Sequence, residues 1–324
     1  MRTTAMTLAL VTANLAIGAT ELRAEFGGWP QGPVRVITPY GAGTANDITA
    51  RHFADRLSKR WGKAVTIENR PGADTVAGVG SFVAAHDNHT LLFAGSASLT
   101  VVPLMKDKLP YDPNRDFVPI STACNTTIVI AASASSNIRS LADLVTRARA
   151  EPGKLLWASG PSLPRFLFEA FLKTQGLDML HVPYKETTPQ ITDLGEGRIH
   201  VLVTGLLPTI PLQEGGKARF LAVTNSEHAL GFPDIPTVKE AGLPIMTVDG
   251  LSGFFGWRDM PAELRDQIAE DLRTVAVDPE LKSRLESLGQ TLRVGTPAEF
   301  AAAIEVQRQW AIDVGKYVNF KATQ

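Results

Sequence analysis

The segment Val34–Arg51, with the sequence VRVITPYGAGTANDITAR, constrains the fold of this 324-residue chain more than any other stretch. Its β-branched run Val34–Thr38 indicates a buried strand, which Pro39 and two glycines then end. From Ala50 to Trp61, apolar side chains recur at three- and four-residue steps, the period of a helix with one buried face. A strand, a tight loop and a helix in succession predict the first unit of an α/β fold.

The loop between this strand and this helix is a candidate anion site. The helix is expected to start near Ala45, with Thr44 or Asn46 as its N-cap. Its unpaired N–H groups and its dipole would attract an anion to the loop Tyr40–Asp47, whose glycines let a ligand approach the backbone. Alternatively, the loop only connects a strand to a helix. A dinucleotide site is disfavoured, because Asn46 stands where the third glycine of G-x-G-x-x-G belongs.

Length and charge restrict the class of protein. At about 150 residues per domain, the length suggests two domains. The hydrophobic fraction of 44% and the charged fraction of 20% are typical of a globular protein. The formal net charge of −1 gives no electrostatic reason to expect a nucleic acid or an anionic membrane surface as a partner. The single cysteine, Cys124, excludes an internal disulfide, and a monomer is expected.

The first residues predict export from the cytoplasm. Arg2 precedes the apolar run Ala5–Ala19, and a small residue, Ala24, follows; this order is typical of a secretory signal peptide over residues 1–24. Cleavage is expected after Ala24 or Ala19, without a lipid-anchoring cysteine, which points to the periplasm of a Gram-negative bacterium. The alternative is a buried N-terminal helix. The run is too short to span a bilayer, which takes about 20 residues.

Two further loops follow predicted strands and carry small or hydroxyl-bearing residues. These are Ser96-Ala97-Ser98 and Ser159-Gly160-Pro161-Ser162. Because ligands of open α/β sheets lie at the carboxyl ends of strands, both are candidate binding loops. The first is equally well explained as an ordinary turn. Helices are expected over Val76–Ala85 and Leu141–Ala150, and over a final segment that opens with the capping box Thr296–Glu299.

Arg165 is expected in the first turn of the helix that follows the second of these loops. Pro164 suits the first position of that helix. A cation in a first turn opposes the helix dipole, a local cost that an anionic ligand would offset. The alternative is an exposed arginine with no role in binding.

Motifs of common catalytic and metal sites are absent from the sequence. It contains no G-x-S-x-G, P-loop, H-E-x-x-H or C-x-x-C motif. The cluster His86-Asp87-Asn88-His89 is better explained as a polar turn than as a metal site, because it falls short of a closed ligand set. The sequence therefore predicts neither a metal nor a cofactor, and it favours binding over catalysis.

Seven stretches, taken in order across nearly the whole chain after the signal segment, resemble one protein family. They are Val36–Arg51, Glu68–Ala73, Lys108–Phe117, Pro152–Leu155, His181–Lys185, Ala222–Thr224 and Pro233–Pro244. Together they resemble the Bug family, the periplasmic solute-binding receptors of tripartite tricarboxylate transporters.

This resemblance implies a two-domain, type II periplasmic binding protein fold with the ligand cleft between the domains. The chain would cross twice, so that 25–123 and 248–324 form domain 1 and 124–247 forms domain 2. A ligand carboxylate would be held by the loop Tyr40–Asp47 and by the loop after Trp157-Ala158. These are two of the loops that the residues themselves indicate.

The chain departs from the family pattern at three places. The first loop reads GAGTAN, where the family usually has two prolines and a run of glycines. Arg165 stands where the family usually has histidine, and Thr204-Gly205 replaces a common Asp-Asn pair. An uncharged Thr204 beside Arg165 favours a more anionic ligand, such as a dicarboxylate or an aromatic carboxylate.

The expected function is capture of a small organic carboxylate and its delivery to the membrane subunits of a tripartite tricarboxylate-type transporter. One alternative is a sensor that presents its ligand-bound state to a membrane kinase. Another is a secreted hydrolase or isomerase that uses Asp47, His181 or Arg165. The residues expected to contact the ligand are Tyr40, Gly41, Ala42, Gly43, Thr44, Ala45, Asn46, Asp47, Ser96, Ala97, Ser98, Ser159, Gly160, Ser162, Arg165, Tyr184, Thr204 and Gly205.

Overall fold

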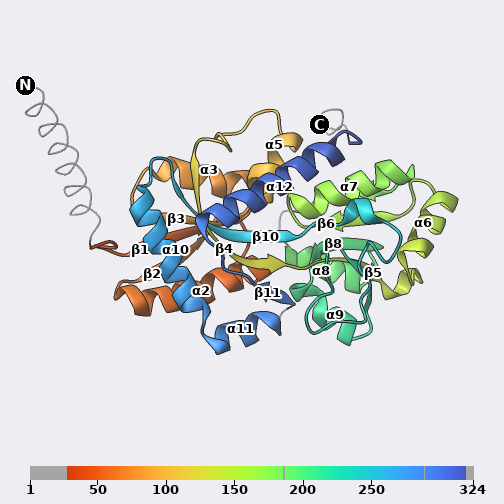
Figure 1. Ribbon diagram of the computed structural model, residues 1–324. Helices are drawn as coiled ribbons and strands as arrows, with labels where there is room; N and C mark the ends of the chain where they lie inside the picture. The colour runs from red at the N-terminus through yellow and green to blue at the C-terminus, as the bar shows by residue number, and fades with distance from the viewer. Residues whose placement is uncertain (1–27, 185–186, 288, 319–324) are drawn as a thin grey trace, which may run out of the picture.

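The computed structural model describes residues 28–184, 187–287 and 289–318, which form two β-sheets flanked by helices (Figure 1). The predicted signal peptide lies outside the described residues. Among the described helices, none combines the length and the apolar composition needed to cross a bilayer. The two-sheet architecture agrees with the predicted α/β class.

The first sheet has six strands in the order β11-β4-β10-β3-β1-β2. Strands β1, β2 and β3 are parallel, whereas β10 runs antiparallel to both β3 and β4. The carboxyl ends of the three parallel strands therefore meet at one edge of the sheet. The strands span Val34–Thr38 (β1), Val65–Asn69 (β2), Thr90–Gly95 (β3), Phe117–Thr126 (β4), Gly250–Trp257 (β10) and Gln290–Leu292 (β11).

The second sheet has five strands in the order β7-β6-β8-β5-β9. Strands β6, β7 and β8 are parallel, and β5 runs antiparallel to its neighbours β8 and β9. The strands span Ile128–Ser133 (β5), Leu156–Ser159 (β6), Leu180–His181 (β7), Val201–Gly205 (β8) and Ala218–Val223 (β9). We call the two sheets, with the helices that cover them, the first lobe and the second lobe.

The chain passes between the lobes twice. Only Thr127 separates β4 of the first sheet from β5 of the second, and the chain returns to the first sheet at β10. The predicted domain limits at residues 123/124 and 247/248 stay a prediction. We propose that the two crossings act as the hinge between the lobes.

The helices largely follow the predicted segments. Val76–Ala85 and Leu141–Ala150 form helices with the predicted bounds. The capping box is confirmed, since the Thr296 hydroxyl accepts from the Glu299 N–H and the Glu299 carboxylate accepts from the Thr296 N–H. The α-helices span Ala45–Trp61 (α2), Val76–Ala85 (α3), Ala97–Thr100 (α4), Val102–Met105 (α5), Leu141–Ala150 (α6), Leu163–Gln175 (α7), Thr187–Gly195 (α8), Ile210–Glu214 (α9), Ala262–Ala276 (α10), Pro279–Glu286 (α11) and Pro297–Gly315 (α12).

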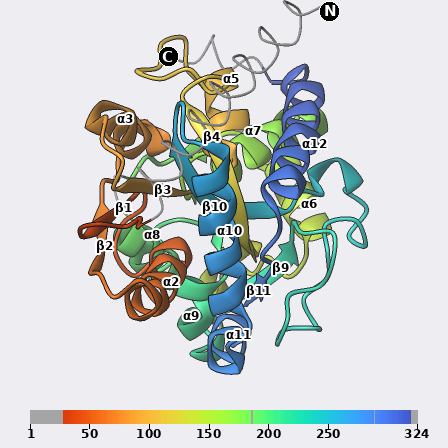
Figure 2. The same ribbon diagram turned by 60° about the vertical axis from the view of Figure 1, so that its left-hand side comes forward.

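Helix α12 connects the lobes. Phe300, near its start, packs in the core of the first lobe against Phe255. Further along, Trp310 packs against Phe166 of α7, with ring centroids 5.9 Å apart. Figures 1 and 2 show α12 running beside the first sheet toward α7. Helix α12 therefore contacts both lobes.

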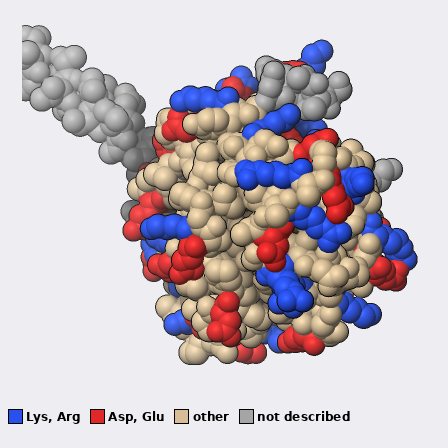
Figure 3. Space-filling view, turned by 90° about the vertical axis from the view of Figure 1, so that its right-hand side faces the viewer, with Lys and Arg blue, Asp and Glu red and all other residues tan. Residues whose placement is uncertain are grey.

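Acidic and basic side chains are intermixed on the face of the molecule that Figure 3 shows. This face is on the side of the second lobe in Figure 1. A mixed surface of this kind does not produce the single-sign field that steers nucleic acids toward a protein.

Three aromatic rings fix α2 to the first sheet. Phe254 of β10 lies edge-on to Phe53 of α2 and to Phe93 of β3, with ring centroids 5.7 and 4.9 Å apart. All three side chains are buried. Because α2 carries the candidate binding loop at its start, this packing also holds that loop in place.

We therefore expect Phe254→Ala to destabilise the protein by about 3–5 kcal/mol, since the substitution leaves a cavity in a core where Phe254 is 1% exposed. The measurement is urea unfolding followed by circular dichroism. Val306→Ala is the control, because Val306 is 73% exposed on α12 and its truncation should change stability by less than about 0.5 kcal/mol. Equal effects of the two substitutions would contradict this description of the core.

Candidate functional site

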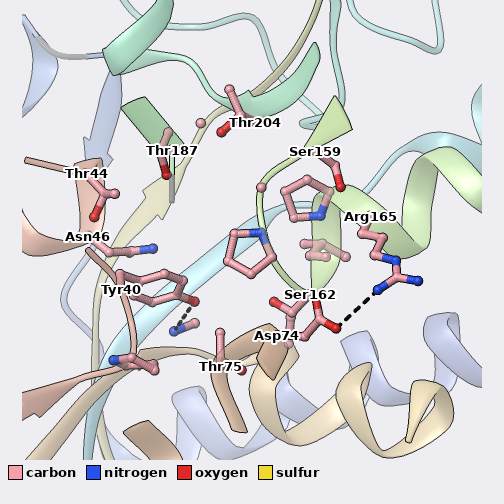
Figure 4. Close-up of a pocket in the computed structure, with 18 of the residues that line it drawn as sticks. Tyr40, Thr44, Asn46, Asp74, Thr75, Ser159, Ser162, Arg165, Thr187 and Thr204 are labelled. Atoms are coloured by element: carbon pink, nitrogen blue, oxygen red, sulfur yellow. Dashed lines mark hydrogen bonds and ion pairs between the residues drawn. The ribbon is translucent and has the colours of Figure 1, made fainter. Parts of the chain in front are cut away.

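A cavity of about 620 Å³ lies between the two lobes (Figure 4). In the first lobe its lining comes from the loops after β1, β2 and β3, the start of β10 and α12. In the second lobe it comes from the loops after β6 and β8 and from the segment that runs from β7 into α8. Its volume is within the roughly 300–1,000 Å³ that small-molecule sites occupy. We call it the interlobe cavity.

Most of the residues expected to contact a ligand line the interlobe cavity. They are Tyr40, Gly41, Thr44, Ala45, Asn46, Ala97, Ser159, Gly160, Ser162, Arg165, Tyr184, Thr204 and Gly205. Five others do not line it: Ala42, Gly43, Asp47, Ser96 and Ser98. Contact between any of these residues and a ligand stays a prediction.

Asp47 holds the shape of the first loop from behind. Its buried carboxylate accepts hydrogen bonds from the Gly43 N–H and the Asn69 amide, both at 2.8 Å, and it forms an ion pair with Arg51 at 2.9 Å. Burial alone would raise the pKa of Asp47, but the hydrogen bonds from Arg51, Asn69 and Gly43 outweigh it and lower that pKa. Asp47 is therefore ionised and stabilises the conformation of the loop.

Ser96 ties the carboxyl end of β3 to distant parts of the first lobe. Its hydroxyl donates to Gln307 Oε1 of α12 at 2.7 Å, and its N–H donates to the Leu251 carbonyl of β10 at 2.9 Å. One residue earlier, the Gly95 N–H donates to the Tyr40 hydroxyl at 3.2 Å. These bonds link the loops after β1 and β3.

The start of α2 presents hydrogen-bond donors to the interlobe cavity. Thr44 is the N-cap, one of the two predicted candidates, and its hydroxyl accepts from the Asp47 N–H. The N–H groups of Ala45 and Asn46, the first residues of α2, have no acceptor within the helix. Asn46 Oδ1 accepts from the Ser252 hydroxyl at 2.6 Å, which leaves the Nδ2 amide to donate elsewhere. Figure 4 shows this amide nitrogen directed into the cavity.

The start of α7 lines the same cavity from the second lobe. The helix begins at Leu163, one residue before the position that the sequence indicated, with Pro164 in its first turn. Ser162 precedes it at a φ of 55°, and its side chain makes no capping bond. The Leu163 and Arg165 N–H groups have no acceptor within the helix, so two helix starts from opposite lobes border one cavity.

Arg165 lies between two carboxyl groups. Its Nε donates to Glu169 Oε1 at 2.8 Å, one turn along α7, and its Nη1 lies 3.3 Å from Asp74 Oδ2 of the first lobe. The expectation of a more anionic ligand, such as a dicarboxylate or an aromatic carboxylate, took the Arg165 charge to be without such partners. The structure instead supplies two carboxyl groups from the chain itself.

Asp74 and Thr75 line the cavity, although the sequence analysis did not select them. They belong to the turn Ala73–Thr75, in which three consecutive residues have left-handed φ angles of 49°, 55° and 78°. For residues other than glycine this region costs roughly 1–2 kcal/mol each. The turn follows β2, whose carboxyl end lies beside that of β1. The strand-end rule applied to β1 and β3 would have found these residues had it been extended to β2.

His181 was considered only as a catalytic alternative, yet it also lines the cavity. Its ring packs against Trp157, with centroids 4.5 Å apart. Burial, together with the nearby Arg165 charge, lowers the pKa of His181 to about 4, so its imidazole is neutral at pH 7.

Two buried oxygen atoms on the cavity wall make no hydrogen bond within the described part of the chain. They are Thr75 Oγ1 and Gln190 Oε1. Buried polar atoms are usually paired, so a ligand or water is the expected partner of each. Among the described residues, no group of three His, Cys, Asp or Glu side chains is arranged to hold a metal ion.

Comparisons with known proteins agree with this geometry. A family model described as tripartite tricarboxylate transporter family receptor matches residues 49–299. A UPF0065 protein of Bordetella bronchiseptica is 32% identical over 305 residues, which cover 94% of this chain and 90% of that protein. BugT of Bordetella pertussis is 29% identical over 220 residues, covering 67% of this chain and 68% of BugT.

Solved structures share the fold. The structure of R. palustris Rpa4515 with adipate has a TM-score of 0.84 and 26% identity, and the match covers 89% of this chain and 98% of the other. The resemblance inferred from seven short stretches is thus confirmed, as is the two-lobed periplasmic-binding fold. The chain belongs to the tripartite tricarboxylate transporter receptor family, whose members include Bug-type periplasmic solute-binding proteins.

Proposed function

We propose that this protein captures a small organic carboxylate in the interlobe cavity, in the periplasm, and delivers it to the membrane subunits of a tripartite tricarboxylate-type transporter. One observation carries the proposal: the starts of α2 and α7, from opposite lobes, border a single cavity into which the Asn46 amide also points. Unpaired N–H groups and helix dipoles at both starts favour a negatively charged group between them.

The same arrangement couples binding to closure of the lobes. A carboxylate has two oxygens and about four acceptor positions, so it can accept donors from both lobes at once. Each lobe alone offers only part of this set. The ligand therefore stabilises the form in which the lobes are together, which is the form that a membrane partner would recognise.

The size and the walls of the cavity agree with a small organic acid. Serine and threonine hydroxyls, prolines and Tyr40 line it beside the helix starts. The relative solved with adipate supports an organic carboxylate as the ligand of the present chain.

A thermal-shift panel tests the proposed function. Linear monocarboxylates from butanoate to octanoate, the dicarboxylates of equal length and a set of aromatic carboxylates would be compared. A ligand at about 100 times its dissociation constant should add about 2.7 kcal/mol to the stability of the folded protein. The absence of any stabilisation across the panel would contradict capture of a carboxylate.

Recovery of the ligand distinguishes a receptor from an enzyme. The best ligand of the panel would be incubated with the protein and then analysed by mass spectrometry. A receptor returns it unchanged, whereas a hydrolase or isomerase converts it. Conversion would favour the enzyme alternative.

Asn46→Ala should weaken binding of that ligand by about 1.5–3 kcal/mol, the range for a hydrogen bond to a charged group. Asn46→Asp should weaken it further, because it places a negative charge beside the carboxylate. Calorimetry measures both. Asn114→Ala and Asn114→Asp are matched controls at an exposed position outside the cavity lining. If the Asn46 and Asn114 variants bind alike, Asn46 is not a ligand donor.

Affinity should be unchanged between about pH 6 and about pH 8, because His181 is neutral over this range and a carboxylate ligand is ionised. Were the bound anion to raise the pKa of His181 into this range, protonation would strengthen binding as the pH falls. Calorimetry in buffers of different ionisation enthalpy detects such a proton. Uptake of a proton on binding would contradict the expectation of a pH-independent affinity.

A further inference from the structure

We propose that Asp74 determines specificity: by pairing with Arg165 it restricts the receptor to carboxylates whose other end is uncharged. This inference rests on the proposed function and concerns the end of the ligand that lies farther from Asn46 and the start of α2. In this proposal Arg165 pairs with Asp74 and helps to hold the two lobes together.

The pair joins the two lobes across the wall of the cavity. Asp74 lies on the strained turn of the first lobe and Arg165 on the first turn of α7, with Oδ2 and Nη1 3.3 Å apart. Lys106 Nζ lies 3.1 Å from the same Asp74 oxygen, and Glu169 holds the Nε of Arg165. Two cations thus face two carboxyl groups, and the Arg165 charge is already matched before a ligand binds.

Asp74 and Arg165 are the only side chains on the described part of the cavity lining that are charged at neutral pH, since His181 is neutral. In Figure 4 they lie on the side away from Asn46 and Thr44. A ligand with its carboxylate at Asn46 therefore extends its other end toward Asp74.

A second carboxylate at that end would meet the Asp74 carboxylate and would find the Arg165 and Lys106 charges already paired. To reach the Arg165 guanidinium it would have to displace Asp74, which Lys106 and the turn would keep nearby. The Asp74 side chain is only 15% exposed, so water screens the repulsion weakly. Such a repulsive element is a common source of specificity.

An uncharged end meets no such repulsion and finds a partner. Thr75, the next residue on the same turn, has a buried hydroxyl oxygen without a hydrogen bond in the described structure. A hydroxyl both donates and accepts, so it suits an alcohol, a carbonyl or a bound water at the ligand terminus. The strained turn therefore carries both residues that we propose to select the ligand, Asp74 and Thr75.

Hexanoate and adipate are suitable probes, because they have equal chain length and differ by one carboxylate. Calorimetry on the full mature protein should show hexanoate binding at least about tenfold more tightly than adipate, which corresponds to about 1.4 kcal/mol. Asp74→Asn keeps the shape of the side chain, removes its charge and frees the Arg165 guanidinium. In this variant adipate should gain at least about tenfold in affinity relative to hexanoate.

Asp87→Asn is the matched control, because Asp87 forms an ion pair of 3.2 Å with Arg35 outside the cavity lining. It should leave the preference between the two probes unchanged. Circular dichroism confirms that the variants are folded, and the wild-type comparison tests the proposal even if Asp74→Asn does not fold.

Four results would overturn the inference. If the wild-type protein binds adipate at least as tightly as hexanoate, the inference is wrong, but the proposed function remains intact. An unchanged preference in folded Asp74→Asn, or an equal shift in Asp87→Asn, would show that Asp74 does not set the preference. If no carboxylate of the panel binds wild-type protein, the proposed function fails, and this inference fails with it.

Discussion

The structure depends on two helix starts that border the same cavity and whose first N–H groups have no acceptor within their own helices. The first residues of α2 and of α7 line this cavity from opposite lobes. In a folded protein such groups require a partner, and helix dipoles make an anion the favoured one. The rest of the molecule positions them: the ring of Phe254 holds α2 on its sheet, and Asp47 fixes the loop from behind without facing the cavity.

Charge is used sparingly in this site. The donors that we assign to the carboxylate are backbone N–H groups and a neutral amide, whereas Arg165 is matched by Asp74 and Glu169. Neutral donors bind an anion without leaving an unpaired buried charge when the site is empty, a state that is costly in a protein interior. The ion pair between Arg165 and Asp74 can then help to hold the lobes together and to select the ligand, while the neutral donors bind the ligand carboxylate. Asp74 itself is carried by a turn in which three consecutive residues have left-handed φ angles.

The parts of the site that could be predicted are local in sequence. The strand, loop and helix around Thr44 are indicated by β-branching, glycines, an N-cap and helical periodicity within a few residues. Ser252 and Gln307 were missed because an antiparallel strand and the last helix bring them to the cavity from far along the chain. The position of Arg165 on its helix could be predicted, but its pairing with Asp74 could not, since the two are 91 residues apart and lie on different lobes.

The central claim is that the receptor recognises negative charge through the helix starts and the Asn46 amide. Calorimetry with the tightest-binding carboxylate of the panel and with the primary amide of the same chain tests it most directly, because the two ligands have nearly the same shape. We expect the carboxylate to bind at least about tenfold more tightly, a difference of about 1.4 kcal/mol. Equal affinities for the acid and its amide would contradict it.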